Sequence, residues 1–122
     1  PPGACVCDRD ALLQEPQADA RVLLLTREEE KRLLQRLEQI TSLADLRRLQ
    51  DRMEQQLGIR LTIAPGPNEV RTLRGITILV HEQRGLCRKT RQSIPAAIRQ
   101  GLERRPEISY ELLDEGGLFG AP

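Results

Sequence analysis

The residues in this chain that are best suited to metal chemistry are its soft ligands, Cys5, Cys7, His81 and Cys87. Three thiols and one imidazole make the four ligands that tetrahedral zinc prefers. Their spacing is unfavourable, because Cys5 and Cys7 are closer together than the usual Cys-x₂-Cys pair and lie in a segment without periodicity. We therefore predict no metal site. The alternative is a zinc site completed by His81 and Cys87, facing each other across a hairpin.

The motifs of common enzymes are missing from the sequence. His81 is the single histidine, and His81-Glu82 does not continue into the His-Glu-x-x-His of zinc proteases. Neither a Gly-x-Ser-x-Gly elbow nor a glycine-rich phosphate loop occurs. A pairing of Cys87 with His81 would still lack an oxyanion donor and a group that orients the base. We predict a protein that is not an enzyme and needs no cofactor.

The charges are unevenly distributed along the 122 residues, although the net charge is only +1. Residues 1–70 carry 10 basic and 12 acidic groups, a net charge of −2. Residues 71–105 carry 9 basic and 2 acidic groups, a net charge of +7, and residues 106–122 carry 4 acidic groups, a net charge of −4. The near-neutral total is therefore a cancellation that conceals a strongly basic middle.

Clustered cations can neutralise phosphates and release counterions, so the basic middle predicts contact with nucleic acid. The alternatives are a solvated basic surface, or one paired with the chain's own acidic tail. Aromatic residues make up only 2% of the chain, which excludes binding by base stacking. The predicted nucleic-acid-binding residues are Arg74, Arg84, Arg88, Lys89 and Arg91.

Two further compositional features bear on the environment of the protein. No stretch approaches the ~18–20 apolar residues that a membrane span needs, so we expect no membrane partner. An odd number of cysteines excludes a complete set of disulfides within the chain. A reducing, cytoplasmic location is the simpler interpretation.

Two amphipathic helices are predicted in the first half of the chain. Thr26 and Glu29 have the spacing of a capping box, followed by a helix over 27–40. Ser42 is the expected N-cap of a second helix over 43–57, which Gly58 should end.

Alternating apolar residues then predict strands over 59–63, 70–80, 86–90 and 108–112, with a turn at 65–68 and a hairpin loop at 82–85. A helix over 94–104, capped by Ser93, should separate the last two strands. The run at 22–25 fits either a short strand or an apolar entry into the first helix. Together these elements predict an α+β domain over 21–113, with helices packed on a small antiparallel sheet. Residues 1–20 are expected to be a leader or linker, and 114–122 a flexible tail.

The two predicted helices share an apolar stripe that must be buried somewhere. One possibility is that it folds onto the sheet of its own chain. The other is that it forms an interaction face for a partner protein or for a second copy in a homodimer. The residues of this predicted face are Leu33, Leu37, Leu46 and Met53.

Residues 32–102 resemble the small α+β accessory segment that follows the nuclease domain in plasmid mobilisation relaxases. The matching elements are Gly58-Ile59 and Arg74-Gly75-Ile76-Thr77, each in the expected order relative to a helix and a strand. The Lys-Gly-Ser and Leu-Gly-Arg elements of that family are replaced by Gly85-Leu86-Cys87-Arg88-Lys89-Thr90. No catalytic residue can be transferred, because those of relaxases lie in another domain.

This resemblance implies an accessory module of a larger bacterial, DNA-handling or mobile-element protein. From the sequence we therefore predict a binding domain that contacts nucleic acid through its basic segment. The alternative is a protein-interaction or dimerisation module that uses the apolar stripe of the helices within 27–57.

Overall fold

Thr26 and Ser42 begin the two long N-terminal helices of the computed structural model, as their capping patterns predict. Thr26 Oγ1 accepts a hydrogen bond from the Glu29 amide at 3.2 Å, and Ser42 Oγ accepts one from the Asp45 amide at 3.0 Å. Both hydroxyls satisfy an amide that the first helical turn leaves unpaired. The structure describes residues 9–65 and 75–115.

The described residues form helices and a two-stranded antiparallel sheet, which confirms the predicted α+β class. In chain order the elements are α1 (Arg9–Gln14), the 3₁₀ helix η1 (Arg21–Leu24), α2 (Arg27–Glu38), α3 (Leu43–Leu57), β1 (Leu61–Pro65), β2 (Ile76–Val80), α4 (Arg88–Arg104) and α5 (Pro106–Glu115).

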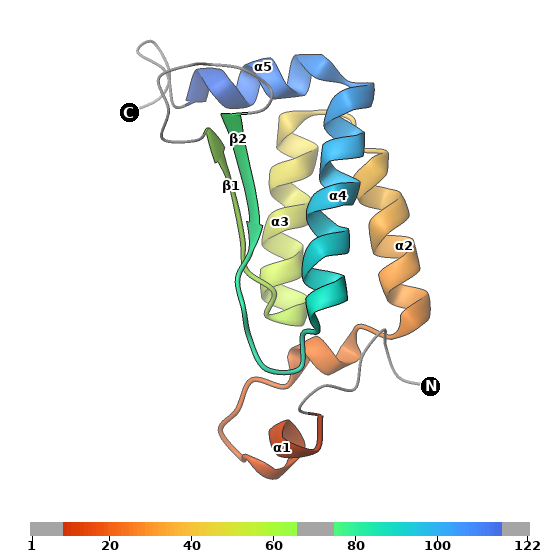
Figure 1. Ribbon diagram of the computed structural model, residues 1–122, viewed down its shortest axis with the longest axis vertical. Helices are drawn as coiled ribbons and strands as arrows, with labels where there is room; N and C mark the ends of the chain where they lie inside the picture. Colours follow the sequence, from red (N-terminus) through yellow and green to blue (C-terminus); the bar gives the residue numbers. More distant parts are fainter. Residues whose placement is uncertain (1–8, 66–74, 116–122) are drawn as a thin grey trace.

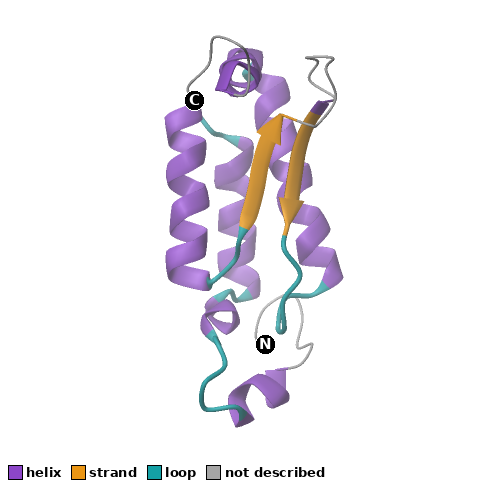
Figure 2. Cartoon of the chain, turned by 90° about the vertical axis from the view of Figure 1, so that its left-hand side faces the viewer, coloured by secondary structure: helices purple, strands orange, loops and turns teal. Residues whose placement is uncertain are grey.

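Helix α4 lies at the centre of the molecule, with β2 packed on one side of it and α2 on the other (Figure 1). Both strands lie on the same side of the long helices (Figure 2). Helix α5 crosses one end of the molecule and packs against α3, α4 and β1. The other end carries η1 and α1 (Figure 1).

The register of the sheet turns one face of each strand toward the helices. Leu61 pairs with Val80 and Ile63 with Ile78, and all four side chains are buried. Leu79 points to the opposite face and is 52% exposed. This alternation is that of a sheet with one buried and one open face, as predicted for residues 59–63.

Helix side chains complete the hydrogen bonding of the sheet edges. In an antiparallel pair, every second residue turns its backbone groups away from the partner strand. On β1, Gln50 Nε2 donates to the Leu61 carbonyl at 2.8 Å and Arg47 Nη1 to the Ile63 carbonyl at 2.9 Å. On β2, Arg99 Nη2 donates to the Ile76 carbonyl at 3.1 Å. The sheet is therefore hydrogen-bonded to α3 and α4 as well as packed against them.

One aliphatic core joins all the elements. Its fully buried large side chains come from α2, α3, α4 and α5 and from the segments beside them: Leu37, Ile40, Leu46, Ile59, Ile94, Ile98, Ile108 and Leu112. Leu12 of α1 also belongs to this core, although it lies within the predicted leader. The two glycines predicted to end a helix and to form the hairpin loop, Gly58 and Gly85, have φ angles of 69° and 81°. Glycine adopts this left-handed conformation without the strain that a side chain would add.

The predicted third strand over 86–90 is wrong, because α4 begins at Arg88 and runs through Pro95. Cys87 is the N-cap, and Ser93, the predicted cap, lies inside the helix. Its hydroxyl donates to the carbonyl of Lys89, four residues earlier in the helix, at 2.9 Å, so it does not cap the helix start.

The predicted strand over 108–112 is also wrong, because these residues belong to α5. Ile108, Leu112 and Leu113 are buried with helical spacing, while Tyr110 is exposed. Pro106 ends α4 as predicted but is also the first residue of α5, a position that proline favours. The apolar run at 22–25 is mostly η1.

Several predicted features lie outside the described residues. They are most of the turn at 65–68, the first part of the strand over 70–80, Cys5 and Cys7, and Arg74. The structure therefore says nothing about them.

We expect Gly101→Ala to destabilise the fold, because Gly101 of α4 lies where α2 approaches most closely. A Cβ there would lie 2.5 Å from the Leu37 carbonyl oxygen and 2.9 Å from Ile40 Cγ1. Alanine normally stabilises a helix interior by roughly 0.5–1 kcal/mol relative to glycine, but overpacking costs about 1–3 kcal/mol. The measurement is the free energy of unfolding in urea. The neighbouring Gln100→Ala is the control, because Gln100 is exposed. A Gly101→Ala variant as stable as the wild type would contradict this packing.

Candidate functional site

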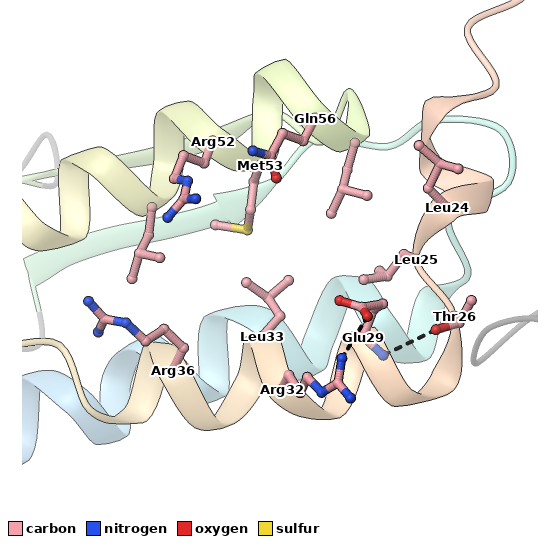
Figure 3. Close-up of a pocket in the computed structure, with 12 residues that line it drawn as sticks. Leu24, Leu25, Thr26, Glu29, Arg32, Leu33, Arg36, Arg52, Met53 and Gln56 are labelled. Carbon is pink, nitrogen blue, oxygen red and sulfur yellow. Dashed lines mark hydrogen bonds and ion pairs between the residues drawn. The ribbon is translucent and has the colours of Figure 1, made fainter.

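A groove of about 610 Å³ runs between α2 and α3 (Figure 3). It forms because α2 packs against α4 more than against α3. Leu24 of η1 and Leu25, which follows it, line one end of the groove. The lining residues are Leu24, Leu25, Thr26, Glu29, Arg32, Leu33, Arg36, Leu49, Arg52, Met53, Gln56 and Leu57.

Apolar side chains form the floor of this α2–α3 groove. Leu25, Leu49 and Met53 are buried and Leu33 and Leu57 are half-buried; these five side chains form its floor. Leu24 is 64% exposed at the η1 end. Single exposed leucines are common on protein surfaces, but here the apolar side chains are contiguous and line a concave surface. Covering such a surface with other apolar groups removes it from water, which is energetically favourable.

Arginines form the rim of the groove. Arg32 Nη1 is 2.9 Å from Glu29 Oε1 within α2, and Arg36 Nη2 is 2.5 Å from Asp45 Oδ1. Arg52 of α3 is exposed and has no ion-pair partner in residues 9–65 and 75–115. Figure 3 shows the side chains of Arg36 and Arg52 reaching toward each other from opposite walls. Glu29 and Asp45 each pair with one of these arginines, so among the described residues Arg52 leaves the rim with an excess of positive charge.

Asp45 holds the α2 wall in place at the turn between the helices. Besides Arg36, it accepts hydrogen bonds from the Thr41 amide at 3.0 Å and from the Thr41 hydroxyl at 3.3 Å. The Arg36 hydrogen bond is the main cause that lowers the pKa of the Asp45 carboxyl, against the opposing effect of burial. The ionised carboxylate therefore links the end of α2, the turn and the start of α3.

The predicted interaction face is divided by the packing. Leu33 and Met53 line the groove, but Leu37 and Leu46 lie in the core with no exposed surface. The stripe thus serves two surfaces, one internal and one lining an open groove. Sequence reasoning missed the rim arginines and Leu24. The only available signal was that Arg32 and Arg52 each directly precede an apolar residue of the stripe.

The predicted nucleic-acid-binding residues that are described lie around the start of α4. Arg84 is ion-paired with Glu15, which lies 69 residues earlier in the sequence. Arg91 is only 27% exposed, and its Nη2 is 3.9 Å from Glu82 Oε1. Arg88 and Lys89 are exposed in the first turn of α4, and their side chains have no ion-pair partner among the described residues. Folding therefore partly neutralises the basic segment.

His81 and Cys87 each contact a threonine. His81 Nε2 is 2.8 Å from Thr62 Oγ1, and Cys87 Sγ is 3.2 Å from Thr90 Oγ1. Thr90 in turn donates to the buried Glu30 carboxylate at 3.0 Å. Within the described part of the chain no group of three or more His, Cys, Asp or Glu residues is arranged to hold a metal ion.

No protein-family model, curated protein or solved structure matches the chain. The resemblance to relaxase accessory segments therefore stays a prediction. Among the described residues, no helix has both the length and the apolar character needed to cross a membrane.

We expect Asp45→Asn to lower the free energy of unfolding by about 1–3 kcal/mol at neutral pH, because it removes a charge that accepts buried hydrogen bonds. The pKa of Asp45 is lowered by folding, so this stabilisation is present above the unfolded-state pKa of about 3.9. It is lost as the pH falls through the folded-state pKa.

Urea unfolding at neutral and acidic pH measures this effect. The stability difference between wild type and Asp45→Asn should shrink below about pH 4. Asp51→Asn, an exposed acid on the same helix, is the control and should change stability by less than about 0.5 kcal/mol. A constant difference across the pH range would refute the proposed role of the carboxylate.

Proposed function

We propose that this domain is a non-catalytic binding module that captures a partner polypeptide in the α2–α3 groove. The observation that carries the proposal is the contiguous apolar surface left open between the two helices. Pockets that bind ligands are concave and mainly apolar, with a few polar groups that fix orientation. The groove combines an apolar floor with an arginine rim and so has both properties.

The shape of the groove favours a peptide over a small metabolite. Leu49, Met53 and Leu57 recur every four residues along α3, so the apolar floor follows the helix axis. A hydrophobic groove of this kind can bind the apolar face of an amphipathic helix from a partner protein. As an accessory domain of a larger bacterial protein, the chain would then act by holding another protein in place.

The expected result is that an amphipathic peptide binds this groove. The probe is a synthetic helix of about sixteen residues, with leucine at every third or fourth position and glutamine elsewhere. In ¹H–¹⁵N NMR titrations, shift changes should concentrate on groove amides such as those of Leu33, Met53 and Leu57. Leu33→Glu should weaken binding at least about tenfold, because it places a charge in the apolar lining.

Leu79→Glu is the matched control, since Leu79 is an exposed leucine on the far face of the sheet. It should leave peptide binding unchanged. Shift changes spread evenly over the surface, or equal losses in the two variants, would contradict the proposal.

Contact with nucleic acid is a second candidate function, favoured by Arg88 and Lys89 at the start of α4, which are exposed and have no ion-pair partner among the described residues. No acidic residue lies in this first turn, where the helix dipole adds partial positive charge. It ranks below the groove because Arg84 and Arg91 each lie beside a carboxylate of the same chain.

For this candidate we expect salt-sensitive binding to a fluorescein-labelled DNA duplex, measured by anisotropy. Two phosphate contacts predict a roughly tenfold loss of affinity between about 50 and about 200 mM salt. The double substitution Arg88→Glu with Lys89→Glu should abolish this binding, whereas Arg52→Glu should not. Binding that ignores both salt and the double substitution would rule out this surface.

A further inference from the structure

We infer that the occupant of the α2–α3 groove is an acidic amphipathic helix of another protein, an inference that rests on the proposed function. Three observations support it: the length of the groove, the charge of its rim and the absence of a matching apolar stripe among residues 9–65 and 75–115.

The length of the floor fits a short helix. Leu49 and Leu57 are separated by eight residues of α3, which corresponds to about 12 Å or two turns. A helix lying between α2 and α3 would place apolar side chains every third or fourth residue against Leu33, Met53 and Leu57. It would thereby continue the helix packing that α2 and α4 begin.

The arginines of the rim favour a partner helix that carries acidic residues on both sides of its apolar face. Arg32, Arg36 and Arg52 surround the floor; Glu29 pairs with Arg32 and Asp45 pairs with Arg36. Arg52 has no ion-pair partner in the described part of the chain, so a partner carboxylate would find a free guanidinium. Among the described residues, Arg32 pairs with Glu29 of its own helix, and an exposed ion pair of this kind contributes little stability. Docking would exclude water and strengthen such pairs.

A second copy of this chain matches the groove poorly. The exposed large apolar residues among those described are Leu13, Leu24, Leu79 and Tyr110, and they belong to four different elements. None of the described helices therefore offers an exposed apolar stripe that could fill the floor. The groove therefore fits a different polypeptide better than a second copy of this chain.

The experiment compares two synthetic peptides of about sixteen residues with identical leucines, one with glutamate and one with lysine at the flanking positions. Binding to the wild-type chain is measured by fluorescence anisotropy at low and high salt. We expect the glutamate peptide to bind at least about tenfold more tightly, with the difference shrinking as salt screens the charges. Arg52→Glu should abolish the preference, and Arg52→Lys should retain most of it.

Arg88→Glu is the matched control, because it makes the same change of charge at an exposed arginine outside the groove. It should leave the preference intact. If both peptides bind with equal affinity and both shift the groove amides in ¹H–¹⁵N NMR spectra, this inference is overturned but the proposed function stands. Failure of both peptides to shift those amides would overturn both. A wild-type dimer in sedimentation that Arg52→Glu dissociates would replace the foreign helix by a second copy.

Discussion

The close approach of α2 to α4 at Gly101 is the contact on which the helix arrangement depends. A glycine there lets the Leu37 carbonyl oxygen lie 2.5 Å from the position where any other residue would carry its Cβ, which is too close for both. The turn at Asp45 links α2 to α3 at one end, and η1 packs on α3 at the other. Between these ends α2 packs against α4, so the space between α2 and α3 stays open. The groove is thus a by-product of where the core is packed most tightly.

Local patterns in the sequence are sufficient to predict the elements whose hydrogen bonds join neighbouring residues. The caps at Thr26 and Ser42 and the left-handed glycines are set by neighbouring residues, and the structure confirms them. The strands predicted over 86–90 and 108–112 failed because short apolar alternation also fits a helix. What distinguishes the two there is distant in the chain: Thr90 is buried against Glu30 of α2, and α5 packs on α3, α4 and β1.

The candidate site was less predictable than the fold, because it depends on which neighbour each surface receives. The stripe of Leu33, Leu37, Leu46 and Met53 is uniform in sequence, and only the packing of α2 divides it between core and groove. The charge count for 71–105 had a similar weakness. It could not include Glu15, which folding brings to Arg84 from 69 residues away. Composition counts charges, whereas binding depends on those that folding leaves unpaired.

The hydrogen bonds from helix side chains to the strand carbonyls affect how the sheet can interact with other chains in a crowded solution. A free sheet edge is a template on which other chains can add strands and aggregate. Gln50 and Arg47 occupy two carbonyls of β1, and Pro65 at its end has no amide to donate. These features protect a two-stranded sheet that lacks neighbouring strands in the described residues. Strand addition by other chains is thereby discouraged at β1, on the side of the molecule away from the proposed binding groove.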